Sequence, residues 1–545
     1  MSYAPMGGLS ALLKDGTKHV TAADDAVMRN IDACKQLGAI VRTSIGPNGM
    51  NKMVTNRLGK LFVTSDAATI VRELEVVHPA AKLLVMAAET QDREVGDGTG
   101  FVITFGAQLM SNAALLIKMG LHTAEIIQGY GRAAAFAMTE LEAMSIKSVT
   151  DPADREQVAV ALRSAIASKL FGMEDFLAGL VAEACVSVLP KNQSMFSVEN
   201  VRVAKVHGGS LNTSSVVKGS VLIHDVEGTI KHLKNAKIAM YTCDVDAEQT
   251  ETKGTVLLNS AEEFANYNRS EEDALEKRIK DIANTGANVI VGPKFGDMAL
   301  HFIERYKMMA IRVPSKFDLR RIARTTGAVV LAKLVPPSPE EIGACDSVGV
   351  EEIGSTKCTI FRQDSSSSRI ATIIVRASTE NLLDDVERAI DDAVNVYKNL
   401  TRDQRLVCGA GATEMELARL LYKYAETLPS LDQYSIKKYA AALEEIPRCF
   451  AENSGGNATE LMNTLQAVHA DGDAQMGVDV ENAGIMNAAE KNVYDLLSAK
   501  LMAIRLTTDA VTTILRIDQI VMSKEAGGPK PRDMMAGDYN DETAA

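Results

Sequence analysis

The 545-residue sequence contains no tryptophan, few prolines and no two cysteines at the spacing of a metal-binding or redox motif. Its seven cysteines are scattered, and the nearest two, Cys345 and Cys358, are too far apart for a CxxC motif or a zinc finger. This pattern is typical of free thiols in a reducing compartment. No apolar run approaches the length of a membrane span, and the first residues lack the basic and apolar regions of a secretory signal. We therefore expect a cytoplasmic protein that does not bind membranes.

Blocks of basic residues are also missing. The sequence has 58 Lys and Arg against 71 Asp and Glu, which gives a formal net charge of −13. Because an acidic surface repels phosphate backbones, nucleic-acid binding is not expected. Hydrophobic residues make up 46% and charged residues 24% of the chain, as in globular proteins. A chain of this length exceeds a single hydrophobic core and predicts about two to four domains.

Hydrophobic periodicity divides the chain into three regions. The first 150 or so residues carry Ala, Leu and Met at helical intervals and are predicted to be mainly helical. Between residues 237 and 331, short β runs alternate with helical stretches, which predicts an α/β domain. Long helices return after about residue 380. The predicted order is therefore helical, then α/β, then helical.

A glycine-rich loop at residues 96–100, GDGTG, is the sharpest local signal. Glycines let a ligand approach the backbone, and the start of the following helix supplies free N–H groups for a phosphate. Asp97 repels phosphate itself but suits a Mg²⁺ ion that bridges phosphate oxygens. An ordinary turn with Thr99 as the helix cap is equally compatible with the residue types.

Two further glycine loops are weaker signals. Residues 43–52, TSIGPNGMNK, do not form a Walker A motif, because asparagine precedes the lysine, and Pro-Asn-Gly also makes an ordinary turn. Residues 409–414, GAGATE, lack the third glycine of a dinucleotide-binding fingerprint, and no strand pattern of the βαβ type precedes them. Thr413 and Glu416 suit a helix capping box instead. Three such loops, each at a helix end and flanked by acids or hydroxyls, together favour one phosphate-binding site.

Two acids outside these loops suit phosphoryl transfer. Asp66 follows a short apolar strand, where a helix cap is the simpler interpretation. Asp392 lies off the apolar stripe of a predicted helix, where a solvated acid paired with Arg388 fits as well, and periodicity does not separate it from Asp391. Transfer of a phosphoryl group to water needs an acid that orients the water and a metal that neutralises charge. Asp392, Asp66 and Asp97 can fill these roles.

A ligand shared by all three loops has a consequence for the domain order. The residues of different character between them must leave one nucleotide domain and return to it, which proteins tolerate because domain ends often lie close together. A residue in the returning linker then moves relative to the site as the domains hinge.

Together these segments resemble the group II chaperonins over nearly the whole chain. The family's TSxGPxGxxK segment is similar to residues 43–52, its TNDGATIL to TSDAATIV at 64–71, and its most diagnostic loop to EVGDGT at 94–99. Other matching segments are HPAAKLL (78–84), ERAIDDA (387–393), GAGATEMELA (409–418), EIPRCFAENSG (445–455) and ILRIDQIV (514–521). Their order and spacing agree throughout.

The resemblance implies a multidomain α and α/β chaperonin fold. The mainly helical equatorial ATP-binding domain is expected from residues 1–150 and 405–545, and a small intermediate hinge domain from 151–220 and 373–404. The α/β apical domain is expected at 221–372, with a helical lid protrusion near 250–275. These bounds define a substrate-binding end, a hinge and an ATPase end.

The resemblance also implies an ATPase that uses ATP and Mg²⁺, with K⁺ as an optional further ion. The expected partners are seven paralogous subunits in a hetero-oligomeric double ring and unfolded clients such as actin and tubulin. The alternative is a structural subunit of the same ring that binds nucleotide but hydrolyses it weakly.

Matching motif positions assign individual roles. Asp392 and Asp66 are expected to orient the attacking water, and Asp97 to hold Mg²⁺. The predicted nucleotide-binding residues are Ser44, Gly46, Pro47, Gly49, Gly98, Thr99, Gly100, Lys169, Gly409, Gly411, Gly477 and Asp495. Phe317, Arg320 and Arg321 are expected to face unfolded clients.

Two of these assignments have simple alternatives, and some residues depart from the family pattern. Lys169 is equally typical of a surface lysine, and the segment FDLRRIA at 317–323 of an amphipathic packing helix. Gly100 and Phe101 stand where most family members have hydroxyls, and Leu496 replaces a proline. These departures favour nucleotide affinity and turnover that differ from those of sister subunits.

Overall fold

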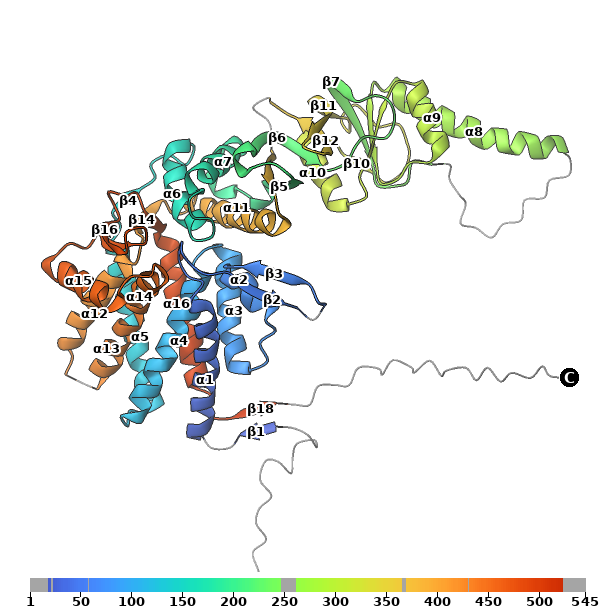
Figure 1. The fold of residues 1–545 in the computed structure, drawn as a ribbon. Helices are drawn as coiled ribbons and strands as arrows, with labels where there is room; N and C mark the ends of the chain where they lie inside the picture. The colour runs from blue at the N-terminus through green and yellow to red at the C-terminus, as the bar shows by residue number, and fades with distance from the viewer. Residues whose placement is uncertain are drawn as a thin grey trace, which may run out of the picture.

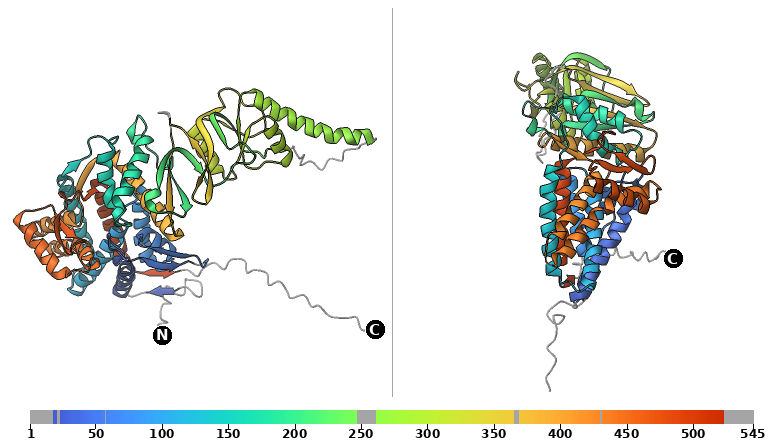
Figure 2. Two further views of the ribbon diagram at one scale, coloured as in Figure 1. Left: turned by 45° about the horizontal axis from the view of Figure 1, so that its top comes forward. Right: turned by 90° about the vertical axis from the view of Figure 1, so that its left-hand side faces the viewer.

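The computed structural model describes residues 18–20, 23–56, 58–246, 261–364, 369–429 and 431–522. Figures 1 and 2 show an elongated molecule, with a helical bundle at one end, an α/β body at the other and a smaller unit between them. The structure is a mixture of helix and sheet, as the sequence predicted. The part of the predicted lid at residues 250–260 lies outside the described residues.

The helical bundle joins segments from both halves of the chain. Its helices are α1 (Ala23–Arg42), α2 (Ala67–Glu73), α3 (Pro79–Glu94), α4 (Thr99–Lys118), α5 (Thr123–Ala143), α12 (Ala412–Glu426), α13 (Asp432–Leu443), α14 (Glu445–Asn453), α15 (Ala458–Asp471) and α16 (Leu497–Leu515). A single hydrophobic core unites both segments, with Leu84 and Phe105 from the first and Tyr439 and Ile504 from the second. The bundle therefore cannot form its core until the later segment is present.

Helix α4 occupies the centre of this core. It is apolar on nearly all sides and packs against α1, α3, α13 and α16, so its environment suits a helix without a polar face. The sequence had suggested no stretch long enough to span a membrane, yet α4 is long and apolar enough by length and composition. It is mostly buried inside the bundle, which accounts for its apolar character without a membrane.

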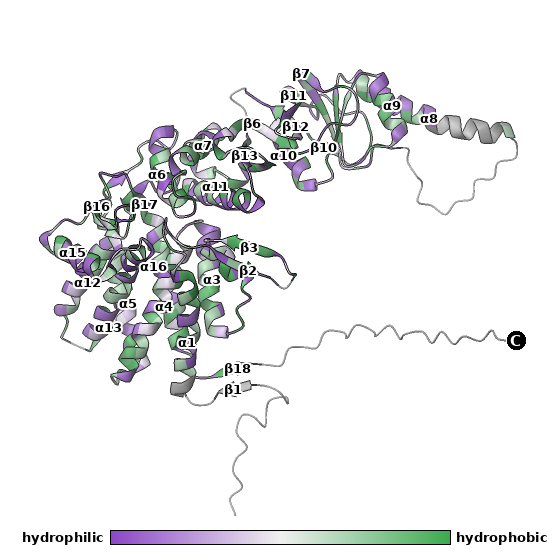
Figure 3. Cartoon of the chain, viewed as in Figure 1, coloured by the Kyte–Doolittle hydropathy of each residue, from purple (hydrophilic) through white to green (hydrophobic). Residues whose placement is uncertain are grey.

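Short strands complete the bundle. They are the hairpin β2 (Lys52–Thr55) and β3 (Leu61–Thr64), the antiparallel sheet of β4 (Lys147–Ser148), β14 (Arg405–Cys408) and β17 (Tyr494–Leu496), the hairpin β15 (Met476–Asp479) and β16 (Gly484–Asn487), and the pair β1 (Lys18–Val20) and β18 (Ile520–Met522). Much of the β2–β3 hairpin consists of hydrophobic residues, which are green in Figure 3. The pair β1–β18 brings both ends of the described chain together.

The unit between bundle and α/β body has its own core. It consists of α6 (Arg155–Ala167), α7 (Glu174–Ser187), α11 (Glu380–Leu400), β5 (Val201–His207), β6 (Ser215–Leu222) and β13 (Ala371–Ala377), with short 3₁₀ turns η2 (Gln193–Met195), η3 (Val198–Asn200) and η4 (Leu211–Thr213). The predicted apolar stripe of α11, which includes Leu383, Ile390 and Tyr397, is buried as expected. That burial fixes the rotation of α11 and hence the direction of its acids.

The strands of the α/β body belong to the same sheet as β5, β6 and β13 of the central unit. Its elements are β7 (His232–Tyr241), α8 (Ala261–Asn284), β8 (Val289–Gly292), α9 (Asp297–Arg305), β9 (Met309–Arg312), α10 (Lys316–Thr326), β10 (Val330–Leu331), β11 (Gly343–Ile353) and β12 (Thr356–Arg362). The strand order is β5-β13-β6-β12-β11-β7-β8-β9, and β10 pairs with β7. The parallel strands β7, β8 and β9 confirm the predicted α/β character. Helix α8 extends away from this body (Figure 1).

Candidate functional site

A pocket of about 350 Å³ lies between the bundle and the unit that contains α6 and α11. Its volume falls in the range of small-molecule sites. The predicted residues that line it are Ser44, Gly46, Pro47, Asp66, Asp97, Gly98, Thr99, Gly100, Lys169, Asp392 and Asp495. Residues from distant parts of the sequence therefore meet at one cavity, as the sequence predicted for the three loops.

The first glycine loop forms one wall of the pocket. The Gly46 backbone has φ +85°, and a Cβ atom there would lie 2.8 Å from the Phe450 ring. Gly49 does not line the pocket, but a Cβ atom at this position would lie 2.4 Å from the Ser44 carbonyl oxygen. Asn453 donates a hydrogen bond from Nδ2 to the Ile45 carbonyl at 2.8 Å. The two glycines thus allow a tight loop that α14 holds in place.

The second glycine loop ends at an open helix N-terminus. Gly98 is the N-cap of α4 with φ +81°, and no side chain caps the helix there. The first N–H groups of a helix have no acceptor inside it, and the helix dipole adds positive charge, so this end suits an anion. The Gly98 N–H donates to Asp97 Oδ1 at 2.7 Å. Gly98 at the cap replaces the alternative in which Thr99 caps the helix.

The third glycine loop differs from the sequence expectation in how its helix begins. Strand β14 ends immediately before Gly409 and pairs antiparallel with β4 and β17, so it is not part of a βαβ unit, in agreement with the sequence. The predicted capping box is wrong, because the Thr413 hydroxyl donates to the Cys408 carbonyl and Glu416 pairs with Arg419 and His469. Gly411 is the N-cap of α12 instead.

The glycines in and near the third loop do not line the pocket, but their lack of a side chain lets neighbouring segments pack closely behind it. A Cβ atom at Gly411 would lie 2.8 Å from Pro447, and one at Gly477 would lie 2.8 Å from the Ala410 carbonyl oxygen. A Cβ atom at Gly409 would lie 3.3 Å from an Asp495 carboxylate oxygen. Ala410 itself lines the pocket. The predicted residues Gly409, Gly411 and Gly477 therefore shape the cavity from behind.

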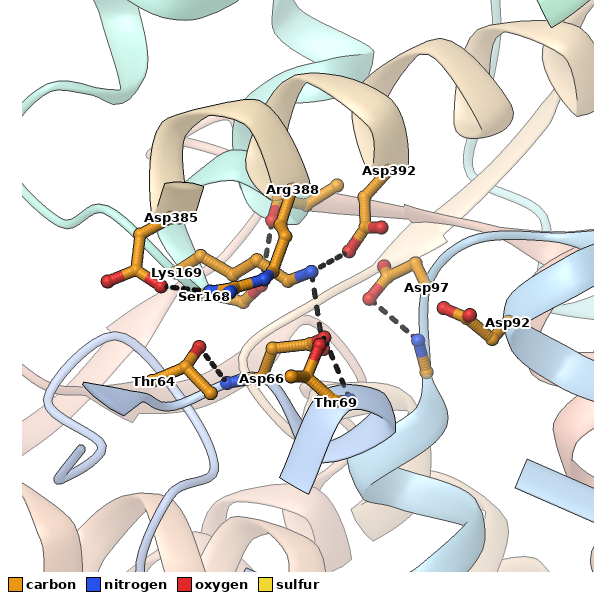
Figure 4. A network of polar contacts seen from close by, with 12 residues as sticks. Thr64, Asp66, Thr69, Asp92, Asp97, Ser168, Lys169, Asp385, Arg388 and Asp392 are labelled. Atoms are coloured by element: carbon orange, nitrogen blue, oxygen red, sulfur yellow. Dashed lines mark hydrogen bonds and ion pairs between the residues drawn. The ribbon is translucent and has the colours of Figure 1, made fainter. Parts of the chain in front are cut away.

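Asp66, Lys169 and Asp392 form a buried charge cluster on the opposite wall (Figure 4). The Lys169 ammonium lies 3.3 Å from Asp66 Oδ1 and forms an ion pair with Asp392 Oδ2. The Lys169 side chain is only 10% exposed, so the alternative of a surface lysine is wrong. Asp66 also caps α2, accepting hydrogen bonds from the Thr69 N–H and hydroxyl at 3.1 and 2.6 Å. Both interpretations of Asp66, helix cap and pocket acid, therefore hold in the structure.

The cluster assigns different charge states to its two acids. Burial tends to raise the pKa of Asp66, but Lys169 and the Thr69 hydrogen bonds together lower it to about 2. Burial raises the pKa of Asp392 well above its usual value, and this effect exceeds the opposing effect of Lys169. Burial lowers the pKa of Lys169, yet Asp392 and Asp66 raise it overall, so the lysine remains charged. Asp66 therefore stays ionised beside Lys169, while Asp392 holds a proton more readily than an ordinary carboxylate does.

The structure also separates Asp392 from its neighbours on α11. Asp392 faces the pocket, whereas Asp391 is exposed. The alternative in which Asp392 pairs with Arg388 is wrong, because Arg388 donates to Asp385 at 2.6 Å. Arg388 lies one helical turn from Asp385 on one side and from Asp392 on the other. Tertiary packing decides which of the two acids it pairs with, and sequence spacing alone does not show this.

Asp97 is the pocket acid nearest the α4 N-terminus. Burial, followed by repulsion from Asp495, raises the pKa of Asp97. Among the described residues no three His, Cys, Asp or Glu side chains form a complete metal site. Mg²⁺ is usually held by one or two carboxylates together with substrate phosphates and water, so the half-buried Asp97 carboxylate beside a phosphate cradle fits this ion.

Several pocket residues were missed by sequence reasoning. Lys500 of α16 lines the pocket and pairs with Asp495 of β17 at 3.0 Å and with Glu414 of α12. Other polar lining residues not predicted are Ser65, Arg163, Ser164, Ser168, Glu174, Asp479, Glu481, Lys491 and Asn492. A lysine in an apolar helix was the one local signal that could have identified Lys500.

The residues expected to face clients lie on α10, in the α/β body. Phe317 is 70% exposed and Arg320 is exposed, while Leu319 and Ile322 are buried against the sheet. Arg321 is half-buried and donates to Asp318 at 2.6 Å. Helix α10 is thus a packing helix that also presents an exposed aromatic side chain and an arginine.

Residues 37–525 match the TCP-1/cpn60 chaperonin family, and the chain belongs to it. It is an ATP-dependent molecular chaperone subunit. The chain is 50% identical to "T-complex protein 1 subunit theta" of Dictyostelium discoideum, over 98% of this chain and 100% of that protein. It is 49% identical to the proteins of the same name from Arabidopsis thaliana, over 97% of each chain, and Homo sapiens, over 96% of each chain. The segments DAATI at 66–70 and GDGTGF at 96–101, which depart from the general family pattern, favour the same subunit type.

Proposed function

We propose that this chain binds Mg–ATP and hydrolyses it to ADP and phosphate, and that this reaction drives closure of a chamber around unfolded proteins. The observation that carries the proposal is the meeting of Asp66, Lys169 and Asp392 across one pocket from a glycine-lined helix N-terminus. Phosphoryl transfer requires positioned acids and charge stabilisation rather than a covalent intermediate, and the pocket offers both.

Each wall of the pocket has a separate role in this proposal. The loops at Gly46 and Gly98 and the N-terminus of α4 hold the phosphates through backbone N–H groups. Asp97 binds Mg²⁺, which when bound neutralises charge on the phosphates. Asp495 accepts hydrogen bonds from the ribose hydroxyls. The nucleotide then lies with its phosphates toward the charge cluster.

Asp392 is the proposed water-orienting acid. Its raised pKa makes it a better proton acceptor than an ordinary carboxylate, and it faces the pocket. Asp66, whose pKa is lowered, stays ionised and holds the Lys169 ammonium beside it. Lys169 thereby fixes the Asp392 carboxylate and supplies positive charge near the terminal phosphate.

The charge cluster also supports coupling between nucleotide and domain movement. Asp66 belongs to the bundle, whereas Lys169 follows α6 and Asp392 lies on α11. We assign the bundle to an equatorial domain (residues 1–150 and 405–545), the central unit to an intermediate domain (151–220 and 373–404) and the α/β body to an apical domain (221–372). A change in the cluster then shifts the intermediate domain against the equatorial one. Helix α8 would belong to the lid near residues 250–275.

The remaining expectations from the family concern the compartment, the partner subunits and the clients of the chain rather than its pocket. We propose that the chain works in the cytoplasm, in a double ring with seven paralogous subunits, on unfolded clients such as actin and tubulin. The exposed Phe317 and Arg320 on α10 support a client-facing role for this helix together with Arg321. K⁺ would be a further ion of the reaction.

The test is a hydrolysis assay specific to this chain. The tagged full-length protein, in the complex that it forms, is photolabelled with 8-azido-ATP carrying radioactivity on the α- or the γ-phosphate. Hydrolysis in this subunit removes the γ label while the α label stays. Asp392→Ala should keep the α label and slow loss of the γ label by about 100-fold. The exposed neighbour variant, Asp391→Ala, should behave as the wild type, and equal γ-label loss in both variants would refute the assigned role.

A second candidate function, nucleotide binding with weak hydrolysis, is favoured by the phosphate loop itself. Gly100 and Phe101 line the pocket without side-chain hydroxyls, where most family members have them. Fewer hydroxyls leave less stabilisation for phosphate or metal. Retention of the γ label by the wild-type chain, while neighbouring subunits lose it, would favour this function.

A further inference from the structure

Lys500 is the second buried lysine of the pocket, and the proposed hydrolysis does not use it. Its side chain is 17% exposed, and its ammonium lies 3.0 Å from Asp495 Oδ2 and pairs with Glu414 Oε1. The three residues come from α16, β17 and α12. Lys500 therefore joins three elements at the wall of the pocket.

Two features keep this lysine charged and in place. The ammonium lies 5.6 Å from the centre of the Phe101 ring, whose face attracts cations. Burial lowers the pKa of Lys500, but Asp495 and Glu414 raise it overall, so the ammonium form persists. Glu414 is almost fully buried and anchors the ammonium from α12. The lysine is thus held by contacts on several sides.

The Asp495 carboxylate is oriented by this lysine. Its backbone is fixed in β17, opposite Val407 of β14. One oxygen, Oδ2, faces Lys500, while Oδ1 lies beside Gly409, where a side chain would crowd it at 3.3 Å. Lys500 and the space at Gly409 therefore determine how the carboxylate enters the pocket.

We propose that Lys500 is a positioning residue for nucleotide selection, which holds Asp495 so that its carboxylate accepts hydrogen bonds from the ribose hydroxyls. This inference rests on the proposed binding of ATP. The inference extends the proposed ATP binding, because it names the group that makes the pocket prefer a ribonucleotide to a nucleotide without ribose hydroxyls. A purely structural lysine would instead affect all nucleotides equally.

The experiment compares ATP with 2′,3′-dideoxy-ATP as competitors of 8-azido-ATP photolabelling on the tagged full-length chain in its complex. A hydrogen bond to a charged group is worth about tenfold or more in affinity, so the wild type should prefer ATP by at least about tenfold. Lys500→Met keeps the side-chain length without the charge. It should reduce this preference to about threefold or less, and Asp495→Asn combined with it should add little further loss.

A matched control and a second variant keep the outcome clear. Lys205→Met removes a lysine that also bridges two acids, Asp384 and Glu387, but lies outside the pocket, and it should keep the wild-type preference. If Lys500→Met is not incorporated into the complex, Lys500→Met with Glu414→Gln removes one buried acid together with the cation and serves instead. An unchanged preference in the folded Lys500 variant, or no preference in a wild type that binds ATP, overturns the inference. Absence of photolabelling in the wild type would instead refute the proposed ATP binding.

Discussion

Lys169 and Asp392 form an ion pair between the loop after α6 and helix α11, and the same ammonium lies 3.3 Å from Asp66. One buried cation therefore serves two buried acids. In such a cluster, removing the cation leaves uncompensated charge, whereas removing one acid leaves a balanced pair. The stability of the nucleotide-free site depends more on Lys169 than on either carboxylate.

Lys169→Met is expected to lower the free energy of unfolding by about 3–5 kcal/mol, because it leaves two acids without their shared cation. Adding Asp392→Asn should recover part of this loss. Urea unfolding of the nucleotide-free chain measures both. Lys205→Met is the matched control, since Lys205 also bridges two acids, Asp384 and Glu387, but is 38% exposed and should cost about 1 kcal/mol or less. Equal losses at the two lysines would contradict the importance of burial.

Asp97→Asn is expected to weaken Mg–ATP binding by about tenfold or more, which is about 1.4 kcal/mol. In the absence of Mg²⁺ the same change should not weaken ATP binding, because it removes a charge that repels phosphate. Competition against photolabelling with and without Mg²⁺ tests both statements. Asp92→Asn changes a nearby acid that pairs with Arg72 and does not line the pocket, so its Mg²⁺ dependence should match the wild type. The metal role fails if both variants behave alike.

Gly100→Thr is expected to test whether the missing hydroxyls limit hydrolysis. A Cβ atom at Gly100 would lie 3.3 Å from Ile45 Cγ1, which is tighter than an ordinary contact. Threonine alone should therefore disturb the first glycine loop, whereas Gly100→Thr with Ile45→Val relieves part of the crowding. Faster loss of the γ label in the double variant than in the wild type is the expected result. Unchanged turnover in a well-folded double variant would show that the hydroxyl is not limiting.

Glu416→Gln is expected to change the pH dependence of stability. Burial tends to raise the pKa of Glu416, but hydrogen bonds from His469 and Arg419 lower it from 4.5 to about 2. A lowered pKa means that the carboxylate stabilises the fold above its unfolded pKa, and that this stabilisation disappears as the pH falls from about 4.5 towards about 2. The contribution near neutral pH is on the order of 3 kcal/mol.

Urea unfolding from about pH 7 to about pH 3.5 measures this contribution as the difference between wild type and Glu416→Gln. The difference should be constant above about pH 5.5 and shrink below about pH 4.5. Glu460→Gln, an exposed acid of α15, should change stability by less than about 0.5 kcal/mol at every pH. If the difference in unfolding free energy between wild type and Glu416→Gln grew on acidification, the lowered pKa of Glu416 would be contradicted.

The features predicted correctly from the sequence depend on local periodicity. The stripe through Leu383, Ile390 and Tyr397 predicted the buried face of α11 and so placed Asp392 on the other side. The glycine loops likewise predicted helix ends near a common cavity. Both signals arise within one or two turns of chain, where backbone geometry alone sets the relation between residues.

The features that were missed depend on pairing between distant segments. Spacing suggested Arg388 as the partner of Asp392, but tertiary packing brings Lys169 there instead. Glu414 and Lys500 lie in different helices, and neither spacing nor composition links them. The four-residue strand β14 begins with Arg405 and is too short for its alternation to be recognised.

The pocket joins Asp66 and Asp97 to Asp495 and Lys500, which has a consequence for synthesis on the ribosome. The nascent chain emerges from its N-terminus, and the ribosome adds about 5–20 residues each second, so roughly 20–90 s separate the first pocket residues from the last. During this delay the α/β body has its complete sequence, while the bundle lacks α16 and more than a third of its core. Truncated messages would therefore yield chains that can fold the α/β body but cannot form the nucleotide pocket. These chains would expose the hydrophobic core of the bundle to the cell's quality-control machinery.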